Sequence, residues 1–143
     1  RISELQTVTS GIKDLCPGAI VDPRAFEPCG YSMNAVLFES YSTMHITPEL
    51  GSSYASFETN QKVTSYKSLI SNVIRTFRPR RFVMTLMAGE GGLSKIDNPL
   101  VANYDTYKRS SLASIKVEED CCYMMGNWVA SPQRNKQRGM TIS

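Results

Sequence analysis

The chain has 143 residues, the usual size of one domain, and its 41% hydrophobic and 20% charged residues supply a core and exclude a disordered chain. Its net charge of +3 is too small to predict nucleic-acid binding, which needs a concentrated basic face. No apolar run approaches the roughly 18 residues of a membrane span. The start, RISELQTVTS, also lacks the apolar core of a signal peptide. We therefore expect neither a nucleic acid nor a membrane as a partner.

The four cysteines stand at positions 16, 29, 121 and 122, and none has C-x-x-C spacing. Without a secretory signal, free thiols in a reducing cytosol are favoured over a disulfide framework. We therefore expect a cytoplasmic protein.

The first part of the chain predicts one short helical turn followed by strands. The turn lies in SGIKDLCPG, where Pro17 and Gly18 stop it. A strand begins at residues 19–21, and Pro23 is expected to bend the chain. Three further strands are expected at residues 30–37, 41–47 and 54–58.

A helix over residues 64–77 is the clearest element. Its apolar residues recur at the three-and-four spacing of one buried face, at Tyr66, Leu69, Ile70, Val73, Ile74 and Phe77. Thr64 or Ser65 can cap its start, and Pro79 ends it.

The second half predicts more strands around a long loop. Residues 82–87, 112–117 and 121–128 have strand character, whereas residues 88–111 are rich in Gly, Ser, Asn and Asp and predict a loop. The polar residues 131–143 predict a mobile tail. Hairpin strands with one strong helix favour an antiparallel α+β fold over alternating βαβ units.

Ser32 and the chain's single histidine, His45, are candidates for chemistry. If Phe38-Glu39 forms a tight hairpin loop, paired positions sum to 77, and Ser32 lies directly opposite His45. Alternation then places His45 on a polar face, away from Met44. A serine beside a histidine can exchange protons near neutral pH.

Other interpretations of this pair stay open. A hydrogen-bonded structural histidine needs no reaction at all. A hydrolase would want an orienting acid and a G-x-S-x-G elbow, which is absent from the sequence. One histidine with scattered cysteines makes no metal ligand set. Cys29 has the opposite parity to Ser32 unless Gly30 marks a bulge, so we assign Cys29 no chemical step.

Four segments, SGIKDLCPGAIVD, FEPCGYSMN, MHITPE and YASFETN, together resemble the eukaryotic pyruvoyl-dependent S-adenosylmethionine decarboxylases. The similarity is dense over residues 10–87, thin around 112–128 and absent from 88–111. The resemblance implies antiparallel sheets flanked by helices, about half of a four-layer α/β/β/α sandwich. It also implies that residues 1–143 are the C-terminal portion of one larger catalytic domain, within the alpha chain.

The resemblance implies decarboxylation of S-adenosylmethionine to the aminopropyl donor for spermidine. The family's zymogen cleaves itself and leaves a covalent pyruvoyl group, to which the substrate amine forms a Schiff base. The serine that becomes this group is expected outside the present sequence. Glu39-Ser40 has the same dipeptide as the processing site, but we do not expect cleavage there. The missing N-terminal part, which comprises the beta chain and the start of the alpha chain, is an expected partner, without which we expect no stable fold.

The resemblance also assigns roles to residues. Ser32 and His45 match the pair that assists self-processing, and Phe26 matches the aromatic residue that stacks on adenine. Glu49 matches the carboxylate that binds the ribose hydroxyls, and Glu58 an acid of the putrescine activator site. The structural alternatives are a core Phe26, an exposed Glu49 and a plain strand-end Glu58.

Two other functions remain as alternatives. One is a non-catalytic regulatory paralogue that activates such an enzyme by heterodimerisation, although the presence of all four matched catalytic and substrate-binding residues favours the catalytic form. The other is an unrelated α+β binding domain. The sequence leaves the oligomeric state open, including a homodimer or a heterodimer with a regulatory paralogue.

Overall fold

The computed structural model describes residues 2–104 and 106–132, with no account of the side chains of Glu90 and Glu118. The chain divides into two compact units. The first comprises the residues up to Arg78 together with Ile96–Pro99, and the second comprises Pro79–Lys95 and the residues from Leu100 onward. Each unit holds one antiparallel sheet, so the predicted antiparallel α+β class is confirmed. Their membership of one larger domain stays a prediction.

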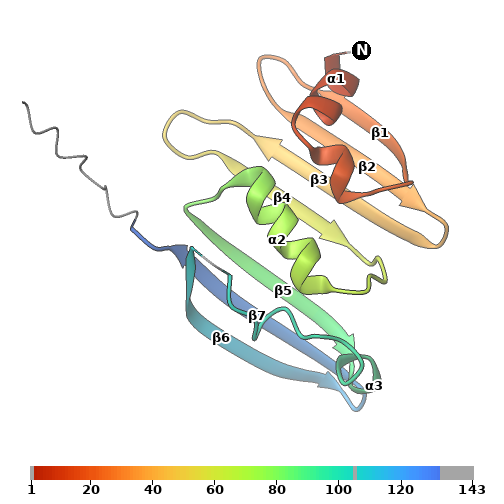
Figure 1. Ribbon diagram of the computed structural model, residues 1–143, viewed down its shortest axis with the longest axis vertical. Helices are drawn as coiled ribbons and strands as arrows, with labels where there is room; N and C mark the ends of the chain where they lie inside the picture. The colour runs from red at the N-terminus through yellow and green to blue at the C-terminus, as the bar shows by residue number, and fades with distance from the viewer. Residues whose placement is uncertain (1, 105, 133–143) are drawn as a thin grey trace, which may run out of the picture. The chain divides into compact units, whose positions relative to one another are not determined.

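The first unit is a four-stranded sheet, sheet A, with helices on one face (Figure 1). Its strands run in the order β1-β2-β3-β4, and every neighbouring pair is antiparallel. In chain order the elements are α1 (Ile2–Thr9), η1 (Ile12–Leu15), β1 (Ile20–Ala25), β2 (Tyr31–Leu37), β3 (Ser40–Thr47), β4 (Tyr54–Thr59) and α2 (Tyr66–Phe77).

The β2–β3 hairpin has the predicted register. Its paired residues sum to 77 along the whole ladder, from Tyr31 opposite Ile46 to Leu37 opposite Ser40. The two-residue turn contains no glycine; Phe38 itself adopts a positive φ of 53° and is 96% exposed. Tertiary pairing of the two strands therefore overrides the usual residue preference of a tight turn.

Pro23 was expected to bend the chain, but it lies within β1 and pairs with Met33. Because β1 is an edge strand, its outward positions need no backbone N–H donor, and a proline is tolerated there.

Helix α2 forms as predicted, two residues later than its expected start. The Ser65 hydroxyl caps it by accepting from the backbone N–H of Ser68 at 3.2 Å. Its C-terminus closes through Arg78, whose N–H donates to the Ile74 carbonyl at 2.7 Å from a left-handed conformation. The expected apolar face is half-buried, and Val73 and Phe77 pack against the core of the first unit.

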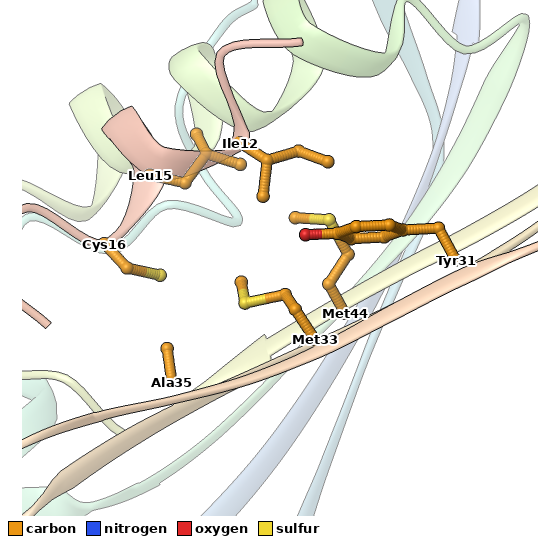
Figure 2. Packing of buried hydrophobic residues seen from close by; sticks show 7 residues of the cluster. All are labelled: Ile12, Leu15, Cys16, Tyr31, Met33, Ala35 and Met44. Atoms are coloured by element: carbon orange, nitrogen blue, oxygen red, sulfur yellow. The ribbon is translucent and has the colours of Figure 1, made fainter. Parts of the chain in front are cut away.

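That core lies between the helices and sheet A (Figure 2). It comprises Ile12, Leu15 and Cys16 from the helical layer and Tyr31, Met33, Ala35 and Met44 from β2 and β3. The sheet residues alternate along their strands, so the intervening positions face away from the helices. The alternation separates a packed face from an open face on the same strands.

The second unit is a three-stranded sheet, sheet B, of order β5-β7-β6 (Figure 1). Its elements are β5 (Arg81–Gly89), α3 (Glu90–Leu93), β6 (Tyr107–Glu118) and β7 (Cys121–Ala130). Phe82 stacks on Trp128 with ring centroids 5.0 Å apart, and Tyr104 and Tyr107 pack edge-on against Phe82. A Cβ at Gly126 would stand 2.5 Å from the Trp128 ring, so this close approach requires glycine.

Other parts of the structure also differ from the sequence predictions. The loop expected at residues 88–111 is shorter, because β5 reaches Gly89, α3 follows, and β6 begins at residue 107 instead of 112. The first residues of β6, YKRSS, are polar and do not show the pattern of a strand, so its start was not predicted. A bulge also interrupts the pairing of β6 at these residues. Helix α1 was not predicted, because ISELQTVT buries only Thr7 and leaves its apolar residues exposed.

Most of the predicted tail lies outside the described residues. Of residues 131–143 only Ser131 and Pro132 are described, and the Ser131 amide donates to the Thr106 carbonyl at 2.7 Å. None of the described helices is long and apolar enough to cross a bilayer.

Candidate functional site

Ser32 and His45 lie directly opposite each other on β2 and β3. Both side chains project from the open face of sheet A, because Tyr31, Met33 and Met44 on either side of them point into the core. Ser32 is half-buried and His45 is exposed. Directly paired residues of an antiparallel ladder have Cα atoms roughly 4.5–5.5 Å apart. The predicted juxtaposition is therefore confirmed.

The Ser32 hydroxyl and the His45 imidazole are both free of side-chain hydrogen bonds to other described residues. A neutral imidazole offers one donor and one acceptor nitrogen, and a hydroxyl offers both functions. The pair can therefore hydrogen-bond to, and exchange a proton with, a group placed over the open face.

Phe26 and Glu49 lie on two adjoining loops at one end of sheet A. The β1–β2 loop is closed by the Phe26 amide, which donates to the Gly30 carbonyl at 3.0 Å. The Cys29 thiol donates to the Pro48 carbonyl at 3.5 Å, so it links this loop to the β3–β4 loop that carries Glu49. Phe26 is 53% exposed, which contradicts the core alternative for its ring. Glu49 is also exposed.

A hollow of about 420 Å³ opens beside the β1–β2 loop. Its lining includes Ile12 from the helical layer and Tyr31 and Ile46 from the helix-covered face of sheet A. Phe26 and Cys29 of the β1–β2 loop also line it. None of Ser32, His45 and Glu49 lines it. The described residues thus bring Phe26, Ser32, His45 and Glu49 toward one end of the sheet, but they do not gather them in one pocket.

Glu58 has a partner that sequence reasoning missed. The Tyr41 hydroxyl donates to Glu58 Oε1 at 2.6 Å, and both residues are exposed. This hydrogen bond, reinforced by the negative charge of Glu58, raises the pKa of Tyr41. Glu58 pairs with Thr43 across β3, so Tyr41 is its diagonal neighbour. The signal for this contact lies in the β3–β4 register, which the β2–β3 register does not determine.

The four cysteines are all free, as predicted. Cys16 is buried in the core, where burial raises the pKa of its thiol and keeps it protonated. The exposed Cys29 and the half-buried Cys121 and Cys122 lie outside that core, and the Cys122 sulfur approaches the Ser114 hydroxyl at 3.2 Å.

The fold and site together define an antiparallel α+β protein with a serine–histidine pair on the open face of a helix-backed sheet. The model of one protein family, adenosylmethionine decarboxylase, matches residues 2–128. The chain therefore belongs to the adenosylmethionine decarboxylase family.

Relatives of this family were found in sequence and in structure. The chain is similar to the S-adenosylmethionine decarboxylase proenzymes of Dictyostelium discoideum and Xenopus laevis, each 51% identical over 85 residues. These matches cover 59% of this chain but only 22% and 25% of those proteins. The chain thus matches about a quarter of the length of these curated relatives.

The fold is also similar to the crystal structure of the Trypanosoma brucei AdoMetDC-delta26 monomer, with a TM-score of 0.77 and 26% sequence identity. That similarity covers 89% of this chain and 53% of the other.

Proposed function

We propose that the complete protein decarboxylates S-adenosylmethionine to the aminopropyl donor used in spermidine synthesis, with a pyruvoyl group that it makes by cleaving its own chain. The observation that carries this proposal is the placement of Ser32 opposite His45 on the open face of sheet A, where neither side chain bonds another residue that the structure describes. Family membership supports it, because the curated relatives are named as decarboxylase proenzymes.

Self-processing is the step in which Ser32 and His45 act. The Ser32 hydroxyl donates a hydrogen bond to the oxygen on which negative charge develops while the chain's own peptide bond rearranges. The His45 imidazole accepts the proton whose loss drives the following elimination. The facing positions of the two side chains support these roles, and so does the lack of a side-chain hydrogen bond from either one to another described residue.

The residues of the open face fit a pyruvoyl group. They offer hydrogen-bonding groups, a hydroxyl and an imidazole, to its carbonyl oxygens. When present, that group supplies the electron sink that decarboxylation requires.

Substrate recognition falls to the two loops at the end of sheet A. The exposed Phe26 ring offers a face on which adenine can stack, and the Glu49 carboxylate can accept hydrogen bonds from two ribose hydroxyls. The contact between Cys29 and Pro48 joins the two loops and supports their action on one ligand.

Glu58 is the proposed contact for an activating diamine such as putrescine. Its exposed carboxylate can pair with an ammonium group. The Tyr41 hydroxyl occupies Oε1, so the diamine would either bind the second oxygen or compete with the tyrosine.

Mass spectrometry of the complete protein tests the proposal together with an assay for carbon dioxide release from carboxyl-labelled S-adenosylmethionine. We expect two chains, one with an N-terminal pyruvoyl group, and release of label. An intact chain that releases no label would contradict the proposal and would favour the regulatory paralogue.

A further inference from the structure

Ser56 on β4 lies directly opposite His45, on the side away from Ser32. The two ladders therefore form one row across sheet A, Ser32–His45–Ser56, with all three side chains on the open face. Ser56 is half-buried, and its hydroxyl makes no hydrogen bond to another described residue. The imidazole is thus flanked by two uncommitted hydroxyls.

Directly opposed polar side chains do meet in this protein. On the same two strands, Ser42 lies opposite Thr59, and their hydroxyls are 2.8 Å apart. In sheet B, Asn127 lies opposite Ser111, and its amide donates to the serine hydroxyl at 2.8 Å. A side chain at position 56 is therefore close enough to hydrogen-bond the longer histidine at position 45.

Other groups of the open face are less well placed to hold the ring. Thr43 and Thr47 are on the same strand as His45, about 6.7 Å away along β3. Glu58 is only a diagonal neighbour of His45, and its Oε1 is engaged by the Tyr41 hydroxyl.

Two charged residues of β1, Asp22 and Arg24, also share this face. Arg24 pairs with Ser32, one strand further from His45, and its guanidinium is bonded to Asp22 at 3.2 Å. Ser56 and Ser32 are therefore the two direct neighbours of His45 across the strands.

We propose that Ser56 is a positioning residue for His45 in self-processing. In the complete protein the imidazole turns so that the Ser56 hydroxyl, which bonds no described residue in this structure, accepts a hydrogen bond from one ring N–H. This bond fixes a single tautomer and holds the lone pair of the other nitrogen toward the group that loses its proton. The inference rests on the proposed function, because it gives Ser56 a role only through His45. It adds a third residue from a third strand to the processing site.

The test uses the full-length proenzyme made by cell-free synthesis, with self-cleavage followed over time on gels. Replacement of the hydroxyl in Ser56→Ala is expected to slow cleavage about tenfold, well short of the loss of the base itself. Ser56→Thr keeps a hydroxyl and should cleave within about threefold of the unchanged protein, whereas Ser56→Val, which has nearly the same shape, should resemble Ser56→Ala. If Ser56→Ala fails to fold, the comparison of Ser56→Thr with Ser56→Val still separates the effect of the hydroxyl from the effect of packing.

Ser42→Ala is the matched control. It removes a serine hydroxyl from β3 that bonds Thr59 on the covered face, so it should lower thermal stability and leave the cleavage rate unchanged. Nitrogen-15 spectra of the His45 ring give a readout that packing alone would not change. We expect one tautomer in the unchanged protein and in Ser56→Thr, and a mixture in Ser56→Ala and Ser56→Val.

The outcomes separate this inference from the proposed function. If the unchanged protein does not cleave, the proposed function fails. If it cleaves, and Ser56→Val cleaves at the same rate with the same single tautomer, the role of Ser56 is wrong while the proposed function stands.

Discussion

The two faces of sheet A differ in how their side chains are engaged, although they belong to the same strands. On the covered face, Met33 and Met44 are 1% and 0% exposed and pack beneath the helices (Figure 2). On the open face, the adjacent Ser32 and His45 have no internal hydrogen-bond partner among the described residues. Alternation thus places the core side chains and the proposed processing residues one residue apart on the same strands.

Neighbouring substitutions should therefore have different consequences. Full burial of a methionine side chain contributes about 1.5–3 kcal/mol to folding, whereas an exposed imidazole contributes little unless it is bonded. A change at position 44 should act on the free energy of unfolding and a change at position 45 on the reaction rate. Four predictions follow this contrast from the largest expected effect to the smallest.

Removal of the imidazole in His45→Ala should slow self-cleavage of the full-length protein by at least about 100-fold, the usual loss for a general base. The melting temperature should fall less than in Met44→Ala, because His45 lies outside the core of the first unit. Gel time courses and calorimetry measure the two quantities. Cleavage at the normal rate would show that His45 does not take the proton.

Met44→Ala should lower the free energy of unfolding of the full-length protein by about 2–5 kcal/mol, because it leaves a cavity in the core. The folded fraction should still cleave itself at nearly the normal rate. Denaturant unfolding measures the first effect, and cleavage normalised to the folded fraction measures the second. A stable variant that fails to cleave would reverse the assignment of the two faces.

Loss of the exposed ring in Phe26→Ala should raise the KM for S-adenosylmethionine about 10-fold, since base stacking on an aromatic ring is worth about 1–3 kcal/mol. Phe38→Ala is the control, because that ring is 96% exposed at the hairpin turn, away from the Phe26 loop. Steady-state kinetics of the processed enzyme measure both. Equal KM values for the two variants would remove Phe26 from the substrate site.

The covered face should also make stability depend on pH. Burial raises the pKa of Cys16, so above about pH 8.5, the ordinary value of a thiol, the unfolded chain loses this proton while the folded chain keeps it. Stability should be unaffected below that pH and should fall above it, by at most about 1.4 kcal/mol per pH unit for this group.

Denaturant unfolding between pH 7 and 10 measures this slope in the full-length protein. Cys16→Ala should remove the Cys16 contribution, although its cavity lowers stability at every pH. Tyr31, whose pKa is also raised by burial, adds a second fall only above about pH 10. A slope that survives unchanged in Cys16→Ala would mean that another group causes it.

Local patterns predicted those elements in which side-chain period and burial agree. Helix α2 and the strands β2 to β4 follow such patterns, and the sum of 77 fixed the hairpin register although its turn lacks the preferred residues. Helix α1 was not predicted, because the residue that it buries is a threonine, Thr7. The Thr7 hydroxyl lies 2.6 Å from that of Tyr31, and this long-range contact leaves no local pattern in the sequence.

In the candidate site, too, some contacts could be predicted from local patterns and others could not. The Ser32–His45 pair could be predicted because strand register is a local property once the turn is known. The contact of Tyr41 with Glu58 was missed because it needs the register of a third strand. The roles of Phe26 and Glu49 depend on a ligand, which register cannot supply, so they stay predictions.

A double-mutant cycle on self-cleavage of the full-length protein tests the central claim most directly, that Ser32 and His45 act as one unit from facing strands. Rates are needed for Ser32→Ala, His45→Ala and the double variant. We predict that the double variant cleaves within about twofold of the rate of His45→Ala alone, because residues that act together lose their effect together. A rate reduced by the product of the two single losses would contradict this claim.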